Sequence, residues 1–381
     1  MAILDYAGKL VLAPMVRTGE LPLRLLALRY GADLVWSPEI VDKKLITCRR
    51  VVNEKINCID YVCDAQNKAP TVILRTHCVR ERSKLVLQLG TASADLAVEA
   101  ASLVAADVAG IDVNSGCPKH FSVHSGMGAA LLKTPDKLVG ILTALVAEVG
   151  KPNSIGISVK IRLLETPEKT FELVRRLCAT GISALTVHCR MVHMRPRERA
   201  IPEDYLRGVA DICHEFGVVC IANGDVACKG DFSRLRTKYN VDSAMIAVAA
   251  EKNVSCFQAE ETAHVINWLE VARAFIAEAI RVDNYFTNSK YILMQMLPGK
   301  VKERQAITVA KTYEEILEAL HIQRPEPVES FVQQFDAVKR SLEKSQNFSL
   351  KRKNEHLDAI GESVKRSQFT LNEESSSVST L

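Results

Sequence analysis

The sequence lacks the features that mark exported and membrane-spanning proteins. It contains no run of about 18 or more apolar residues, which is the length a helix needs to cross a bilayer. Its first residues, Met-Ala-Ile-Leu-Asp-Tyr, lack the basic segment and the apolar core of a signal peptide. We therefore expect a protein that is neither exported nor anchored in a membrane.

The sequence also lacks a pattern of paired cysteines. Its 11 cysteines form no C-x-x-C pair and follow no regular spacing. This odd, irregular set argues against a disulfide framework and a structural zinc site, so we expect no metal and a reducing, cytoplasmic compartment. Cys189 and Cys220 lie in apolar strings and are predicted to be small buried side chains.

A large excess of one charge is missing as well. Lys and Arg total 49 against 45 Asp and Glu, and the net charge of +4 does not by itself indicate a nucleic-acid-binding protein. It does permit a local basic groove for RNA. The 381 residues exceed the roughly 250 of a (β/α)8 barrel, which leaves room for a second, smaller unit.

What the sequence does contain is a recurring alternation of short apolar runs and helix-like segments. Eight runs in this alternation predict a closed (β/α)8 barrel, or TIM barrel, with a doubly wound open sheet as the alternative. The expected strands are Leu10–Met15, Ala32–Ser37, Leu85–Gly90, Gly110–Asn114, Gly156–Arg162, Ala184–His188, Val218–Asn223 and Ser243–Ala249. The expected helices between them are Leu21–Tyr30, Ala92–Ala106, Pro135–Val149, Pro167–Thr180 and Glu203–Phe216.

Three departures from this alternation divide the chain. The segment Tyr61–His77 carries an extra strand-like run and predicts a hairpin beside the barrel. After about Glu260 no clear strand pattern remains, so we expect a barrel over 1–260, a small helical domain over 261–350 and a polar, disordered tail over 351–381. The helices expected in the second domain are Val265–Asp283, Asn288–Met296, Thr312–Leu320 and Val328–Gln346.

Polar residues stand where the expected strands end, and in a TIM barrel those ends carry the active site. Asn114 closes the fourth strand, and Cys117 follows on a loop before Pro118, which restrains the cysteine toward an extended conformation. From spacing alone, a turn that happens to contain a cysteine is an equal alternative. The small residues of the Ser-Gly-Met-Gly-Ala-Ala turn that starts at Ser125 suit a close approach of the backbone to a ligand.

Two further strand ends favour a phosphorylated cofactor. Lys160 is an isolated cation in an apolar strand, which is costly unless an anion lies nearby, and His188 occupies the matching place on the next strand. Small residues follow the seventh and eighth strands, as a backbone cradle for phosphate requires. Met15 and Gln88 suit a planar heterocycle that forms hydrogen bonds, although Met15 also fits core packing and Gln88 also fits a buried polar hydrogen bond.

These segments together resemble the flavin-dependent tRNA-dihydrouridine synthases. The motifs that carry the resemblance occur in family order and are LAPMVR, LQLG, DVNSGCPK, GMGAALL, VKIR, VHCR and IANGD, beginning at residues 12, 87, 112, 126, 159, 187 and 221. The match is closest to the eukaryotic synthase 2 branch, which acts on uridine 20 of the D-loop. The branch is indicated by LPLRLLALRYGADLV, RVVNE and NYFTNSKYILMQML, which begin at residues 21, 50 and 284.

The resemblance implies a chemistry and a set of site residues. It implies FMN in the barrel, NADPH as reductant, transfer of a hydride to a uracil ring of tRNA, and Cys117 as the acid that protonates the other carbon. The implied FMN contacts are Pro14, Met15, Val16, Gln88, Lys160, His188, Asn223, Gly224, Asp225, Ala247 and Val248. The implied substrate contacts are Asn114 beside the uracil and Lys119, Arg190, Arg195 and Arg197 toward tRNA phosphates, although such arginines also fit a solvated surface.

The sequence departs from the branch at three positions. The branch has arginine where Val248 stands, a basic residue where Val192 stands and lysine where His124 stands. The chain beyond the helical domain is also too short for the double-stranded-RNA-binding domain of some members. Two alternatives therefore stay open, namely an FMN barrel oxidoreductase that acts on a free pyrimidine and a non-catalytic RNA-binding relative.

Overall fold

The computed structural model describes residues 4–65, 68–195 and 197–322. Within these ranges eight parallel strands form a closed barrel. They are β1 (Leu10–Leu12), β2 (Leu34–Trp36), β7 (Leu85–Gly90), β8 (Gly110–Ser115), β9 (Gly156–Leu163), β10 (Ala184–Met191), β11 (Val219–Asn223) and β12 (Ser243–Ile246). Each strand pairs with the next, β1 pairs with β12, and β2 pairs with β7 through Val35 and Leu85. The TIM barrel is therefore confirmed, and the open sheet is excluded.

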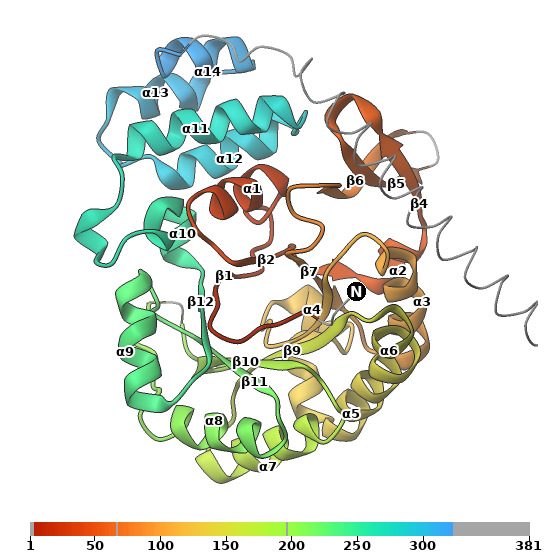
Figure 1. Ribbon diagram of the computed structural model, residues 1–381. Coiled ribbons are helices and arrows are strands. Elements are labelled where there is room, and N and C mark those ends of the chain that lie inside the picture. The colour runs from red at the N-terminus through yellow and green to blue at the C-terminus, as the bar shows by residue number, and fades with distance from the viewer. Residues whose placement is uncertain (1–3, 66–67, 196, 323–381) are drawn as a thin grey trace, which may run out of the picture. The chain divides into compact units, whose positions relative to one another are not determined.

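The apolar runs become strands because helices cover them from outside, so that both faces of each strand are buried. Six longer helices surround the barrel in Figure 1: α1 (Leu21–Arg29), α3 (Ala94–Val104), α5 (Pro135–Ala144), α7 (Pro167–Cys178), α8 (Leu206–Glu215) and α9 (Lys229–Tyr239). The side chains of Ser93 and Thr166 cap the first turns of α3 and α7, and prolines occupy the first turns of α5 and α7. A π-helical stretch, η3 (Leu145–Gly150), and α6 (Lys151–Asn153) continue α5.

Short elements make the connections around the barrel. They are β3 (Ile40–Val41), α2 (Asp42–Ile46), η1 (Glu54–Ile56), α4 (His120–His124), η2 (Gly128–Lys133), α10 (Val248–Lys252), η4 (Val254–Phe257) and η5 (Thr262–His264). Two predicted strand ends were wrong. β1 stops at Leu12, before Pro14, which has no N–H to donate to a ladder. β12 stops at Ile246, and Val248 and Ala249 begin helix α10.

The hairpin excursion is confirmed, but it has a third strand that the sequence did not indicate. β4 (Cys48–Asn53), β5 (Cys58–Ala65) and β6 (Lys68–His77) form an antiparallel sheet beside the barrel. β4 was missed because Arg49 and Arg50 are charged and exposed, so the strand shows no apolar run. Behind this sheet Arg24 of α1 forms an ion pair of 2.8 Å with Glu81, and both side chains are completely buried.

Four helices follow the barrel: α11 (Trp268–Arg281), α12 (Phe286–Met296), α13 (Lys302–Val309) and α14 (Tyr313–Ala319). Helix α13 was not predicted because its sequence is largely polar. Figure 1 shows this group above α1 and α10, and α11 packs against α1 while α12 packs against α10. The predicted helix Val328–Gln346 and the tail over 351–381 lie outside the described residues. The domain boundary at 260 stays a prediction.

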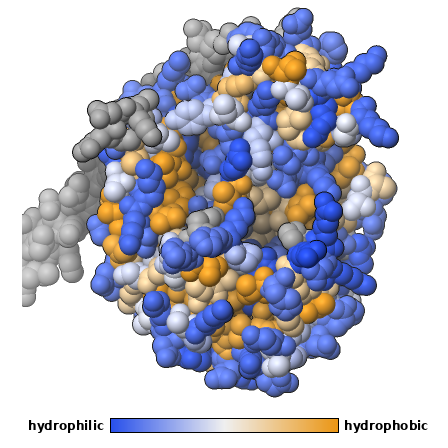
Figure 2. Space-filling view, turned by 180° about the vertical axis from the view of Figure 1, so that it is seen from behind, coloured by the Kyte–Doolittle hydropathy of each residue, from blue (hydrophilic) through white to orange (hydrophobic). Residues whose placement is uncertain are grey.

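The helical region reaches the rim of the barrel through α12. The amide of Asn288 donates to the carbonyl of Arg17 at 2.7 Å, and the Arg17 guanidinium lies 4.0 Å from the centre of the Tyr291 ring. Figure 2 shows a face on which hydrophilic side chains surround dispersed apolar ones. Among the described residues, no helix is long and apolar enough to cross a membrane.

Candidate active site

A cavity of about 260 Å³ opens at the carboxyl ends of the barrel strands. Strand ends from β1, β7, β8, β9, β10, β11 and β12 all contribute to it. Ten of the predicted site residues line it: Pro14, Val16, Gln88, Asn114, Cys117, Lys119, Lys160, His188, Asn223 and Ala247. Residues more than 200 positions apart in the sequence therefore surround one space.

Cys117 is held in the cavity wall by its own loop. The side-chain oxygen of Asn114 accepts the backbone N–H groups of Gly116 and Cys117, each at 3.0 Å. The carbonyl of Cys117 accepts the N–H of Ala129 at 2.9 Å, which ties the loop to η2. A side chain at Gly128, where φ is +58°, would place its Cβ only 2.7 Å from that carbonyl oxygen. These contacts thus hold the Cys117 loop, and with it the thiol, in one conformation.

The surroundings of Cys117 keep its thiol protonated. Burial raises the pKa of Cys117 above its ordinary value and outweighs the hydrogen bond from the backbone of Lys119, which lowers it; the carboxyl of Glu39 adds a smaller rise. The side chain is only partly buried, so a molecule in the cavity can reach the sulfur. A protonated, accessible thiol is suited to donate a proton at neutral pH and not to act as a nucleophile.

Beneath the cavity Gln88 and Asp112 form a buried network. Gln88 donates to Asp112 at 2.8 Å, and Ser158 donates to the other oxygen of the same carboxyl at 2.7 Å. Burial raises the pKa of Asp112 to about 6 even though these hydrogen bonds oppose the rise. Asn114 donates to the side-chain oxygen of Gln88 at 3.3 Å. The network fixes which way both carboxamides face.

Lys160 and His188 form a polar wall across the cavity. Lys160 donates to the side-chain oxygen of Asn223 at 2.8 Å, and burial lowers the pKa of Lys160 to about 8, with Arg162 adding to the effect. Burial and three neighbouring cations, Lys160 among them, hold the pKa of His188 well below its usual range, so the imidazole is neutral. Since Arg190 can only donate, its contact of 3.1 Å makes Nε2 of His188 the acceptor.

The predicted RNA contacts differ in their exposure. Arg190 is buried, forms an ion pair with Asp225 and donates to the carbonyl of Glu198 at 2.7 Å. Arg195, Arg197 and Lys119 are exposed at the rim. The guanidinium of Arg190 therefore holds the loop after β10, whereas the other three cations face outward.

The remaining predicted residues lie around the cavity without lining it. Gly224 has a φ of +118°, and its Cα lies against His188, where an added Cβ would come within 3.4 Å. Met15 packs against the core. Val248, at the start of α10, is 56% exposed.

Sequence reasoning missed two charged residues of the site. Glu39, which lies just before β3, lines the cavity, accepts a hydrogen bond from Ser122 at 3.4 Å and has a second oxygen that is buried without a partner. Arg162 donates to the carbonyls of Gly116 and Met191 at 2.8 Å and 3.1 Å, and so braces the Cys117 loop. Arg162 ends the VKIR segment and could have been selected there, whereas no local signal indicated Glu39.

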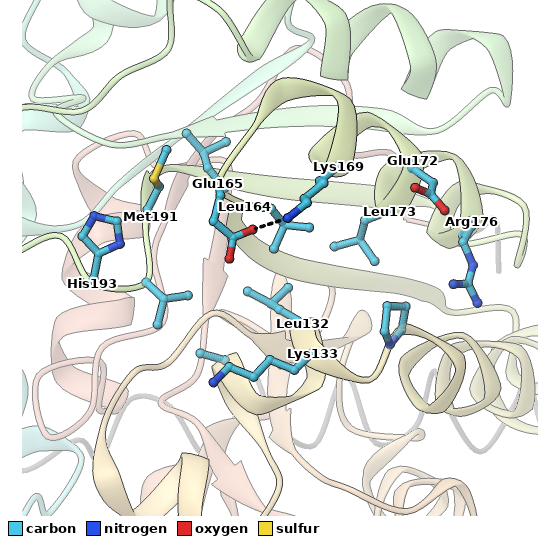
Figure 3. Close-up of a pocket in the computed structure, with 14 residues that line it drawn as sticks. Leu132, Lys133, Leu164, Glu165, Lys169, Glu172, Leu173, Arg176, Met191 and His193 are labelled. Carbon is cyan, nitrogen blue, oxygen red and sulfur yellow. Dashed lines mark ion pairs between the residues drawn. The ribbon is translucent and has the colours of Figure 1, made fainter.

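A second cavity of about 340 Å³ lies beside the first, between η2 and α7. Figure 3 shows Leu132, Leu164 and Leu173 inside it, with Lys133 near one side and the ion pair between Lys169 and Glu165 near the other. Val192, one of the three departures, also lines this cavity. The ring of His124, another departure, stacks on that of His120 at the exposed end of α4.

Comparison with known proteins decides the family. The model of the family "Dihydrouridine synthase (Dus)" matches residues 11–347. The chain belongs to the dihydrouridine synthase family. The tRNA-dihydrouridine(20) synthase [NAD(P)+] of Schizosaccharomyces pombe is 53% identical over 328 residues, which cover 85% of this chain and 67% of that protein. The Saccharomyces cerevisiae protein of the same name is 45% identical over 377 residues, which cover 96% of this chain and 97% of that protein.

Membership in the dihydrouridine synthase family agrees with the resemblance that the sequence motifs indicated. The likeness to the Saccharomyces cerevisiae protein extends over nearly the full length of both chains, so it includes the helical region as well as the barrel. The departures at Val192, His124 and Val248 therefore lie in a chain whose family is established.

Proposed function

We propose that this protein reduces a uridine of the tRNA D-loop, at position 20, to 5,6-dihydrouridine, with NAD(P)H as reductant and FMN as bound cofactor. The observation that carries the proposal is the protonated Cys117 thiol, fixed in the wall of a cavity that Lys160 and His188 close on the other side. The names of the two yeast relatives supply the reaction and the uridine position.

The donor set of the cavity fits FMN. The cofactor has a flat ring with alternating hydrogen-bond donors and acceptors and a phosphate at the end of its chain. Gln88 and the Lys160–Asn223 pair supply polar atoms on one side of the cavity. Near Gly224 and at the start of α10, small side chains leave backbone N–H groups available for a phosphate.

Each residue of the wall would then have a defined task. FMN, when bound, supplies the hydride that NAD(P)H provides. Lys160 would compensate negative charge on the cofactor, and Pro14, Met15 and Val16 would cover the ring edge. His188, Asn223, Gly224, Asp225, Ala247 and Val248 would complete the cofactor site. Of these, Asp225 would act through its ion pair with Arg190.

On the substrate side, Cys117 would protonate the uracil carbon that does not receive the hydride. A thiol with a raised pKa remains the acid form throughout the neutral range, which the step requires. Asn114 faces the same space and would lie beside the uracil, although its oxygen already accepts two N–H groups of the loop. Arg162 and Glu39 would keep the thiol in place and protonated.

Contacts to the RNA backbone would come from exposed cations at the rim. Lys119 is exposed on the loop that follows β8, and Arg195 and Arg197 are exposed on the loop that follows β10. Arg190 would hold the loop that carries the two arginines. The helical region touches the same rim at Arg17 and would extend the RNA surface. We also propose that the protein binds tRNA and that it does so in the cytoplasm.

The test is to map dihydrouridine in unmodified tRNA after incubation with the purified protein, FMN and NADPH. Reduction at position 20 by the natural chain, and none by Cys117→Ala with its flavin still bound, is the expected result. Reduction of a free pyrimidine without RNA would support the alternative oxidoreductase. A protein that binds RNA but neither flavin nor NADPH would be the non-catalytic relative.

A further inference from the structure

Two cysteines and a lysine meet on the hairpin sheet, well away from the cavity residues. Cys48 begins β4 and Cys63 lies near the end of β5. The amine of Lys44, on α2, donates to the Cys63 sulfur at 2.8 Å, and the hydroxyl of Thr47 lies 3.4 Å from the same sulfur. The sheet and the end of α2 thus surround one thiol with polar groups.

The two cysteines are directly opposed in the antiparallel ladder, where Cys48 is the partner of Cys63. Opposed residues of such a ladder have Cα atoms about 4.5–5.5 Å apart, which lies inside the range of disulfide-bonded cysteines. Both side chains point to the same face of the sheet because opposed residues share a face. The pair needs no change of strand register to form a bond.

The electrostatic surroundings give the two thiols different roles. The hydrogen bond from Lys44, supported by Thr47, lowers the pKa of Cys63. Burial and the nearby Cys63 raise the pKa of Cys48, so this thiol stays protonated. A thiolate reacts with oxidants faster than a thiol, so Cys63 is the sulfur to be attacked first and Cys48 the one to resolve it.

The chain contains a natural comparison for this pair. The sulfurs of Cys178 on α7 and Cys213 on α8 lie 3.9 Å apart, but both residues are buried and both have strongly raised pKa values. No lysine contacts either sulfur among the hydrogen bonds of the described residues. Proximity is thus common to both pairs, whereas the lysine contact and access from the edge strand β4 belong only to Cys48 and Cys63.

We propose that Cys63 is a peroxide-sensitive residue and that it forms a reversible disulfide with Cys48. The Cys63 thiolate attacks one peroxide oxygen, the O–O bond breaks, and a sulfenic acid forms while the peroxide is reduced and leaves as water or an alcohol. The Cys48 sulfur then attacks the Cys63 sulfur. The S–S bond forms, the S–O bond breaks, and the proton of Cys48 leaves with the hydroxyl group as water.

The position of the pair suits a reversible modification in a reducing compartment. Cys48 is partly exposed at the first residue of an edge strand, so reducing thiols can reach a disulfide there. Cys63 is itself buried, but its sulfur contacts the exposed residues Lys44 and Thr47, so it lies just beneath surface groups that a small peroxide can pass. The disulfide would join the start of β4 to β5. The chain reaches β4 from Glu39 through β3 and α2. The proposal is independent of the reaction proposed above, because none of its residues lines the active-site cavity.

The test uses the reduced full-length protein, a small excess of hydrogen peroxide, and quenching with an alkylating agent before peptide mass spectrometry. We expect a Cys48–Cys63 peptide that has lost two hydrogens and that dithiothreitol restores, while Cys178 and Cys213 remain alkylated. In Cys48→Ser the sulfenic acid of Cys63 should persist and react with dimedone. Cys48 is partly exposed at the start of the edge strand, so its serine variant keeps the fold.

Lys44→Met measures the contribution of the lysine, and Lys43→Met is the matched control on the same helix. Loss of the Lys44 contact lowers the thiolate fraction, so the oxidation rate should fall at least about threefold, with no change in Lys43→Met. Equal rates in the two variants would refute the assigned activation. Oxidation of Cys178 and Cys213 at the same rate, or an oxygen-containing link between Lys44 and Cys63 in place of the disulfide, would overturn the proposal.

Discussion

Asn114 is the residue whose replacement separates two explanations of the site. Its side-chain oxygen accepts the N–H groups of Gly116 and Cys117, and its amide donates to Gln88. Asn114→Ala removes both loop hydrogen bonds, whereas Asn114→Asp keeps the acceptor oxygen and replaces the N–H donor with a second carboxyl oxygen. The pair of variants therefore tests whether Asn114 works mainly by holding the Cys117 loop.

The magnitude follows from the two lost hydrogen bonds. Each contributes about 0.5–1.5 kcal/mol, so the loop of Asn114→Ala loses about 2 kcal/mol of its preference for the observed conformation. If catalysis needs that conformation, the rate of proton transfer falls about 30-fold. Asn114→Asp should retain the greater part of the rate, because the oxygen that orders Cys117 is still present.

The assay is a single-turnover measurement of dihydrouridine formation by flavin-loaded, prereduced enzyme with saturating tRNA. Flavin content serves as the control, since neither variant removes Lys160 or His188. Equal losses in Asn114→Asp and Asn114→Ala would refute the loop argument and favour direct contact of the Asn114 amide with the uracil. An unchanged rate in Asn114→Ala would refute both roles.

Three further predictions follow from buried charges. Lys160→Met should weaken FMN binding about 10- to 100-fold, since a charge-assisted hydrogen bond contributes about 1.5–3 kcal/mol. Fluorescence titration of the apoprotein with FMN measures the affinity, and an unchanged affinity would contradict the contact of Lys160 with the cofactor. Arg24→Met should lower the free energy of unfolding by about 3–5 kcal/mol because it leaves Glu81 buried without its partner. Arg207→Met, in an exposed ion pair, should lower it by under about 1 kcal/mol. Urea denaturation compares the two variants, and similar losses would contradict a stabilising role of the buried pair. The single-turnover rate should fall as the Cys117 thiol ionises, and because the pKa of this thiol is raised, the fall should come above the ordinary cysteine value of about 8.5; a fall centred below that value would contradict a thiol acid.

Individual residues show which features of the site could be predicted from the sequence. The motif around Cys117 predicted both the loop and its place at the mouth of the barrel, because a strand, a polar end and a small-residue turn are local features. Lys160 stood out because a cation in an apolar strand is costly unless an anion lies nearby, and the structure gives its amine the neutral amide oxygen of Asn223. The family resemblance then added the cofactor and the substrate.

Other residues show where sequence reasoning failed. Glu39 stands in a stretch with no strand or motif signal, and it joins the site only because β3 pairs with β7 beside the Cys117 loop. No local signal indicated that Asp225, 35 residues away, holds Arg190 inside the protein; a contact of Arg190 with tRNA stays a prediction. The largely polar sequences of β4 and α13 show no apolar periodicity. Both elements form because contacts with the rest of the fold stabilise them.

The sequence by itself determined the alternation of strands and helices and the residue types at the strand ends, because each depends on neighbours along the chain. Only the tertiary structure decided that Glu39 and Arg162 belong to the site and that Lys44 meets Cys63. Those facts depend on barrel closure and on strand register, which place residues tens to hundreds of positions apart within hydrogen-bonding distance. Burial then sets the pKa values of the side chains so assembled, and burial is a property of the folded chain alone.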